Sequence, residues 1–214
     1  MTASAIHTDT VNITLNGLTL PGNLSVPENA TGIVIFSHGS GSSRYSPRNN
    51  YVAEILQNTG LATLLFDLLT AEEDENYENR FNIDLLSIRL IDVTHWVQSY
   101  QKTKGLNIGY FGASTGSASA LKAAAFYGHD IGAVVSRGGR PDLAMAALPK
   151  VLAPTLLLVG GWDKEVIQLN EKAYQNLKCE KKLVIIPQAS HLFKEPGKLN
   201  EVAQQTADWF STRI

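Results

Sequence analysis

The 214-residue sequence predicts an α/β fold with a mainly parallel β-sheet. Short apolar runs rich in β-branched residues alternate with longer segments of helical periodicity, which is typical of proteins built from β-α-β units. Near the N-terminus, Asn16-Gly17 separates two strand-like segments, and this dipeptide favours a tight antiparallel hairpin. We therefore expect an eight-stranded, mostly parallel sheet that begins with an antiparallel hairpin and carries helices on both faces.

The predicted strands are short and rich in aliphatic side chains. After the two hairpin strands come continuous apolar runs such as GIVIFS and TLLLVG, which are typical of strands buried on both faces. The predicted strands cover residues 10–15, 18–26, 32–37, 61–66, 106–111, 131–136, 155–160 and 182–186.

Helical segments fall between these strands. The first follows Ser46-Pro47, a pair that suits the N-cap and first turn of a helix. The predicted helices cover residues 48–58, 83–100, 114–127, 164–177 and 198–210. The acidic run Glu72-Glu73-Asp74-Glu75 lies outside them, and we expect it to form a solvated surface loop.

The composition argues against several classes of protein. Eighteen Lys and Arg residues against 20 Asp and Glu residues leave no basic excess, so nucleic acid is not an expected partner. A hydrophobic content of 44% is too high for a disordered chain. No apolar run approaches the roughly 20 residues of a membrane span. Residues 1–7 lack the features of a signal peptide, and the lone Cys179 cannot form an internal disulfide. We expect a cytoplasmic protein with one domain over residues 1–214.

The motif GASTG at residues 112–116 is the strongest functional signal. It lies between an apolar strand and an Ala-rich helical segment, the context in which G-x-S-x-G forms a nucleophile elbow. Such a turn projects the Ser114 hydroxyl above the sheet, and the small neighbours let other backbone approach it. The N-terminus of the following helix favours the negative charge that develops during acyl transfer. We therefore expect Ser114 to be a nucleophile.

A nucleophilic serine needs a base, and the base needs an acid that orients it. His191 follows the last predicted strand, so its loop opens at the same sheet edge as Ser114. Asp163 follows the seventh predicted strand, and we expect it to be the acid. Asp142 and Asp130 are alternatives, although Asp142 is also suited to capping a short helix.

Two backbone N–H groups are expected to stabilise the oxyanion. One should come from Thr115, the residue after the nucleophile. The other should come from Ser40 in the Gly-rich loop HGSGSSR, with Gly39 or Gly41 as alternatives. This loop lacks the lysine of a P-loop and the spacing of a dinucleotide-binding loop, so nucleotide binding is not predicted. His38 is expected to support the loop rather than to act as the base.

Together, the order of strands, the GASTG elbow, the GGWD acid segment, the QASH histidine segment and the HGSG loop resemble the α/β-hydrolase superfamily. Within it, the chain is similar to dienelactone hydrolase-like proteins, which have no cap domain. The resemblance covers nearly the whole chain. It implies a Ser114–His191–Asp163 triad and neither a metal nor an organic cofactor. Dienelactone hydrolases proper use a cysteine nucleophile, so Ser114 favours a serine esterase-like activity over a dienelactone substrate.

Three further residues are candidate substrate contacts. Arg137 follows the sixth predicted strand at the same edge, where it would either bind a carboxylate or phosphate or pair with Asp142 or Glu165. Arg44 lies in the oxyanion loop and is expected to pin it, with substrate binding as the alternative. Trp162, beside the predicted acid, either lines a pocket or packs against the scaffold.

The sequence thus predicts a serine hydrolase that cleaves an ester or related acyl bond of a small substrate through an acyl-enzyme. Acyl transfer to another acceptor, perhydrolysis and non-catalytic ligand binding on the same fold are the alternatives. Only residues 137–153 separate the sixth strand from Pro154, which is too little for a cap domain. We therefore expect an open, shallow site. The sequence does not predict an oligomeric state.

Overall fold

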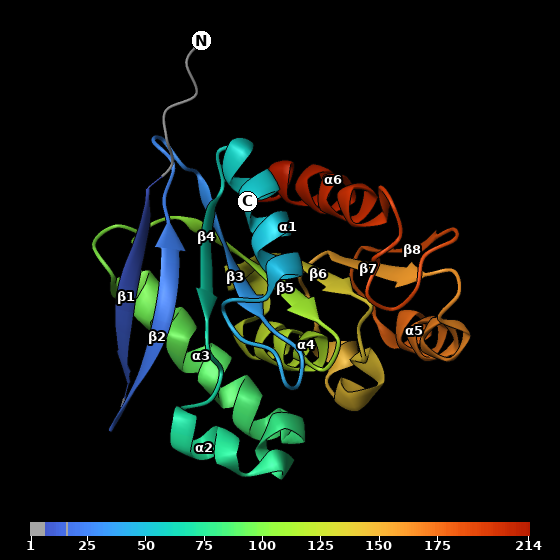
Figure 1. Cartoon of the computed structure of the whole chain (residues 1–214), viewed down its shortest axis with the longest axis horizontal. Coiled ribbons are helices and arrows are strands. Elements are labelled where there is room, and N and C mark those ends of the chain that lie inside the picture. The colour runs from blue at the N-terminus through green and yellow to red at the C-terminus, as the bar shows by residue number, and fades with distance from the viewer. Residues whose placement is uncertain (1–6, 16) are drawn as a thin grey trace.

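One mostly parallel sheet forms the centre of the molecule (Figure 1), and the computed structural model describes it over residues 7–15 and 17–214. Its strands are β1 (Thr8–Leu15), β2 (Leu18–Ser25), β3 (Gly32–Ser37), β4 (Ala62–Phe66), β5 (Asn107–Ala113), β6 (Ile131–Arg137), β7 (Thr155–Gly160) and β8 (Lys181–Ile186). They lie in the order β1-β2-β4-β3-β5-β6-β7-β8. The β1–β2 and β2–β4 pairs are antiparallel, and the other neighbouring pairs are parallel. The predicted sheet is confirmed.

The N-terminal hairpin is also present. β1 and β2 pair along their whole length, with Leu15 opposite Leu18. Gly17, in the turn, has a φ of 86°, which glycine adopts without strain. The other turn residue of the prediction, Asn16, lies outside the described residues, and so do residues 1–6, on which the expectation of no signal peptide rested.

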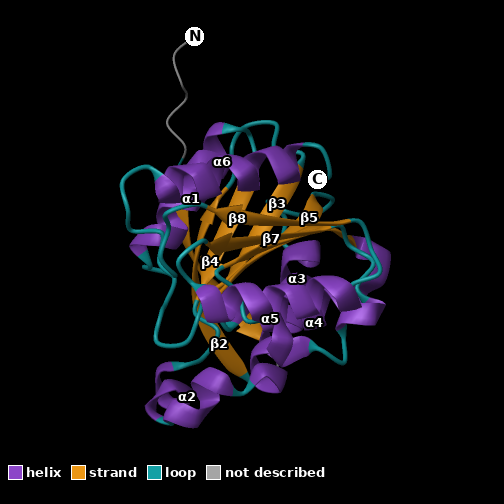
Figure 2. Ribbon diagram, turned by 90° about the vertical axis from the view of Figure 1, so that its right-hand side faces the viewer, coloured by secondary structure: helices purple, strands orange, loops and turns teal. Residues whose placement is uncertain are grey.

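Helices cover both faces of the sheet, as predicted (Figure 2). They are α1 (Pro47–Asn58), α2 (Ala71–Glu75), α3 (Ile83–Ser99), α4 (Gly116–Tyr127), α5 (Lys164–Asn176) and α6 (Lys198–Ser211). Side chains of α1 and α6 form one apolar core with Phe36 and Phe111. Side chains of α3, α4 and α5 form the other with Ile35 and Tyr110. Because adjacent strand residues point to opposite faces, β3 and β5 contribute to both cores.

Burial explains which strands have continuous apolar sequences. All residues of β3, β4 and β7 are buried, since helices cover both faces of these inner strands. The last strand, β8, lies at the edge of the sheet, and only Ile186 in it is fully buried. Its apolar sequence therefore predicted the strand correctly but not its place at the edge.

The acidic run does not form the surface loop that we expected. Its residues belong to the short helix α2, whose N-cap Thr70 forms a capping box with Glu73. Glu73 also pairs with Arg89, and Asp74 pairs with Arg80. Thr70 followed three residues later by Glu73 is a capping-box pattern visible in the sequence, and it predicts the start of this helix.

The connection from β6 to β7 is short. It contains only the 3₁₀ helices η3 (Pro141–Ala144) and η4 (Leu148–Lys150), and no cap domain is evident in it. Among the helices described, none combines the length and the apolar character that crossing a membrane requires.

Candidate active site

Ser114 occupies a strained turn between β5 and α4. Its φ is 51°, in the left-handed region that residues with a side chain rarely adopt. Its backbone N–H donates to the Arg137 carbonyl at 3.2 Å, and its carbonyl accepts from the Arg140 N–H at 3.0 Å. Because the turn comes first, α4 begins at Gly116 and not at Ser114.

The two glycines of the motif allow the turn to pack closely against its neighbours. A methyl group on Gly116 would lie 2.1 Å from the Ser37 carbonyl oxygen. One on Gly112 would lie 2.4 Å from the Ser117 Cα. A side chain on Gly116 would therefore push the start of α4 away from the end of β3, and one on Gly112 would push it away from β5.

Asp163 and His191 are in direct contact. The Asp163 Oδ2 lies 2.6 Å from the His191 Nδ1, and the exposed fractions of their side chains are 17% and 38%. The alternative acid Asp142 instead makes a bidentate pair with Arg140, with both distances 2.9 Å. Asp130 precedes β6, so it lies at the N-terminal ends of the parallel strands, on the side of the sheet opposite to Ser114. Of the three candidate acids, Asp163 is the one that contacts His191.

Backbone contacts hold the acid and histidine loops together. The Trp162 N–H donates to the Ala189 carbonyl at 3.0 Å, and the Gly161 N–H donates to the Ile186 carbonyl at 2.8 Å. A methyl group on Gly160 would lie 2.5 Å from the Ala189 oxygen, so only glycine permits this approach. Backbone hydrogen bonds and close packing therefore hold the two loops in the positions from which the side chains meet.

Ser114 and His191 line one cavity of about 170 Å³, together with Gly39, Ser40 and Arg137. No hydrogen bond joins the two side chains in the part of the chain that the structure describes. Hydrogen bonds between a nucleophile and its base are often long without substrate and tighten when substrate binds. The arrangement places a serine and a histidine at one concave surface, with an acid behind the histidine.

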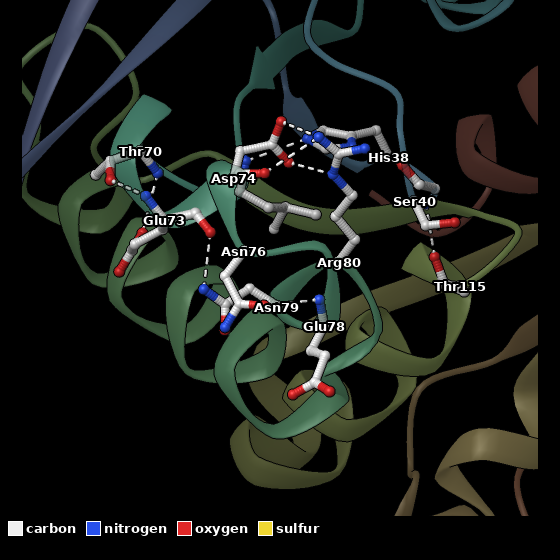
Figure 3. Close-up of polar contacts among 12 residues, drawn as sticks. His38, Ser40, Thr70, Glu73, Asp74, Asn76, Glu78, Asn79, Arg80 and Thr115 are labelled. Carbon is white, nitrogen blue, oxygen red and sulfur yellow. Dashed lines mark hydrogen bonds and ion pairs between the residues drawn. The ribbon is translucent and has the colours of Figure 1, made fainter.

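The Gly-rich loop lies over the elbow. A methyl group on Gly39 would lie 3.0 Å from the Ser114 Cβ. The backbone N–H of Ser40 donates to the Thr115 Oγ1 at 2.9 Å (Figure 3). The two residues expected to supply the oxyanion donors are thus in contact, with one donor engaged by the hydroxyl of the other residue.

His38 supports the start of this loop. The Leu68 N–H donates to its Nε2 at 3.2 Å, so the proton is on Nδ1, which lies 2.9 Å from the Gly39 carbonyl oxygen that accepts it. Burial lowers the pKa of His38. A neutral ring that both donates and accepts within the scaffold fits the expected supporting role.

Arg44 pins the other end of the loop. Its backbone N–H donates to the Asp67 Oδ1 at 2.8 Å, and its guanidinium pairs with the other carboxylate oxygen. The guanidinium also donates to the Tyr45 hydroxyl at 2.6 Å. Because Asp67 already balances its charge, Arg44 acts on the loop and has little left to offer a substrate.

A second cavity, of about 290 Å³, shares the residues of this loop and extends to α2. Leu68, Leu69 and Leu86 form its apolar part. Asp74 and Arg80, paired as Figure 3 shows, also line it. The short helix α2, which was not predicted, therefore lines a cavity beside the site.

Arg137 and Trp162 differ in their surroundings. Arg137 is buried and pairs with neither Asp142 nor Glu165, so that alternative was wrong; it donates instead to the Asn49 Oδ1 at 3.3 Å. Trp162 is 61% exposed and is not among the residues that line the Ser114 cavity.

No group of three or more His, Cys, Asp or Glu side chains that could ligate a metal gathers in residues 7–15 and 17–214.

No family model matches the chain. A dienelactone hydrolase from Anabaena variabilis is 55% identical in sequence, and its crystal structure aligns with a TM-score of 0.96 over 99% of this chain and 100% of that one. This chain belongs to the dienelactone hydrolase family of α/β-hydrolases. Est1E from Butyrivibrio proteoclasticus shares the fold. It is 18% identical and aligns with a TM-score of 0.81 over 95% of this chain and 98% of its own.

Curated relatives of this dienelactone hydrolase family member carry a different name. A Mycobacterium tuberculosis protein, named as a phosphoribosyl transferase, is 52% identical over 205 residues. The match covers 96% of this chain but only 46% of that protein. The chain therefore spans about half the length of the curated relatives it matches, and their name describes proteins with a large further segment.

Proposed function

We propose that this protein is a serine hydrolase that cleaves an ester or related acyl bond of a small substrate through an acyl-enzyme on Ser114. One arrangement carries the proposal. Ser114, on a strained elbow, shares a cavity with His191, and the His191 ring contacts the Asp163 carboxylate. A binding protein has no physical need for a nucleophile, a base and an orienting acid together.

In the first half of the reaction, the Ser114 Oγ attacks the carbonyl carbon of the substrate, and its proton passes to the His191 Nε2. The His191 Nδ1–H donates to the Asp163 carboxylate, which stabilises the imidazolium that forms. When the tetrahedral intermediate collapses, His191 returns the proton to the leaving alcohol. In the second half, His191 takes a proton from the water that attacks the acyl-enzyme. When this second tetrahedral intermediate collapses, the bond between the acyl carbon and the Ser114 Oγ breaks, His191 returns the proton to Oγ, and the carboxylic acid leaves.

The oxyanion of each tetrahedral intermediate is stabilised by the backbone N–H groups of Thr115 and Ser40. The Ser40 N–H donates to the neutral Thr115 hydroxyl at rest. A charged oxyanion is a stronger acceptor than a hydroxyl, so the substrate oxygen takes the place of the Thr115 hydroxyl at this N–H as charge develops. No step of this mechanism uses a cofactor.

The test is hydrolysis of p-nitrophenyl acetate by the wild type and by Ser114→Ala. We expect the variant to lose about three orders of magnitude or more in kcat/KM, because no other group can form the acyl-enzyme. Ser99→Ala, which removes an exposed hydroxyl at the end of α3, is the matched control. Wild-type turnover in a folded Ser114→Ala variant, with the fold checked by circular dichroism, would refute the proposal.

A further inference from the structure

Arg137 is 7% exposed, yet no carboxylate pairs with it in the described structure. Its Nη2 donates to the Asn49 Oδ1 at 3.3 Å, whereas its Nε and Nη1 are buried without a partner. Arg140, three residues later, has the bidentate pair with Asp142 that a partly buried arginine usually finds. A buried charge without a partner costs free energy, so an anionic ligand that paired with the Arg137 guanidinium would be stabilised there.

A second arginine lies beside it. Arg48, in the first turn of α1, is half-buried, and its Nε is also buried without a partner. Burial, followed by the charge of Arg48, lowers the pKa of Arg137 to about 10, so the Arg137 guanidinium is still charged at neutral pH. Two cations that repel each other therefore face the same space with no acid between them.

That space is the Ser114 cavity. Arg48, Asn49, Ser42 and Arg137 line it together with Ser114 and His191, and no Asp or Glu is among its lining residues. The first turn of α1 also lies here, and a helix N-terminus attracts anions. This side of the cavity thus presents hydrogen-bond donors and positive charge to whatever binds at Ser114.

We propose that Arg48 and Arg137 form an anion subsite beside Ser114. This subsite binds a dianionic group of the substrate, such as a phosphate monoester. This inference rests on the proposed function. Two guanidinium groups offer several N–H donors in planar forks, a pattern that matches the oxygens of a phosphate. A dianion balances both charges, whereas a single carboxylate balances only one.

The first experiment measures binding and does not depend on turnover. Inorganic phosphate and acetate are titrated into the wild type by calorimetry at constant ionic strength. We expect phosphate to bind more tightly than acetate, and Arg48→Gln to weaken phosphate binding about tenfold or more, since charge-assisted hydrogen bonds are lost. Arg137→Met tests the buried partner, with its fold checked by circular dichroism. Arg140→Gln removes a charge at the same sheet edge but outside the cavity, and should leave the affinity for phosphate unchanged.

The second experiment links the subsite to hydrolysis. Three p-nitrophenyl esters of similar acyl length are compared, with a phosphonate, a carboxylate or a methyl group at the end of the acyl chain. We expect kcat/KM to fall in that order, and Arg48→Gln to reduce the preference for phosphonate over methyl about tenfold. Arg140→Gln should leave that preference intact.

The outcomes separate the two proposals. If Arg48→Gln alters neither the affinity for phosphate nor the preference among the esters, the subsite proposal is wrong. The proposal of a serine hydrolase is unaffected by that result. Faster hydrolysis of the carboxylate ester than of the phosphonate ester would overturn the assignment to a dianion. Phosphate binding that depends on Arg48, in a protein whose Ser114→Ala variant keeps full esterase activity, would support the subsite and refute the proposed function.

Discussion

The backbone N–H of Ser40 donates a hydrogen bond to the side-chain hydroxyl of Thr115 at 2.9 Å, across 75 residues of sequence. This bond holds the Gly-rich loop against the nucleophile elbow before any substrate arrives. Donors that are already in place need little rearrangement when the oxyanion forms, and this is what makes such groups effective. The Thr115 hydroxyl is therefore expected to position Ser40.

Thr115→Ala should lower kcat for p-nitrophenyl acetate about tenfold with little change in KM. The loss is smaller than the effect of removing a donor altogether, because both backbone N–H groups remain. Thr115→Ser keeps the hydroxyl and should restore most of the activity. Steady-state kinetics of the three proteins give the answer. An Ala variant as fast as the wild type, or faster, would mean that the hydroxyl only competes with the substrate.

Asp163→Asn should reduce kcat by about three to four orders of magnitude, because an amide no longer holds the His191 ring in the required tautomer. Asp142→Asn is the matched control, since that carboxylate pairs with Arg140. It should change kcat little. Equal losses in both variants would argue that Asp163 acts through the scaffold and not through His191.

Protein stability should depend on pH through His38. Its pKa is lowered by burial in the folded protein, whereas unfolding restores the ordinary value of about 6.5. Between these two values the unfolded chain binds a proton that the folded protein does not bind. The stability that the neutral His38 contributes to the folded protein is therefore complete above about pH 6.5. It is lost as the pH falls towards the lower pKa of His38 in the folded protein.

The corresponding measurement is the free energy of unfolding in urea at about pH 7.5 and at about pH 5. The wild type should lose more stability on acidification than His38→Gln, in which the titrating ring is absent. The same loss in both proteins would show that other groups account for the acid sensitivity.

The sheet was predictable because its inner strands are buried on both faces. Strands such as β3 and β7 are therefore mostly apolar, and this leaves continuous apolar runs whose bounds match the strands in the structure. The place of Ser114 was predictable for a similar reason. The close contacts of Gly112 and Gly116 restrict the elbow to a recognisable local pattern.

Contacts between distant segments were harder to predict. For Arg137 the sequence offered nearby acids as partners, but its contact is Asn49, 88 residues away on the first turn of α1. Nothing in the sequence marked the neighbouring Arg48 as a functional residue. It is only the first residue of a predicted helix. The ion pair between Glu73 and Arg89, which ties α2 to α3, likewise depends on how these helices pack. Such side-chain partners follow from tertiary packing, which the periodicity of a sequence does not encode.

The central claim is that the substrate acyl group becomes attached to Ser114. The most direct test is to mix the protein with a p-nitrophenyl ester, quench with acid, and locate the added mass by peptide mass spectrometry. We predict the mass of one acyl group on the peptide that contains Ser114, and none in Ser114→Ala. An acyl group on a different residue, or ester turnover with no covalent adduct in either protein, would contradict the account.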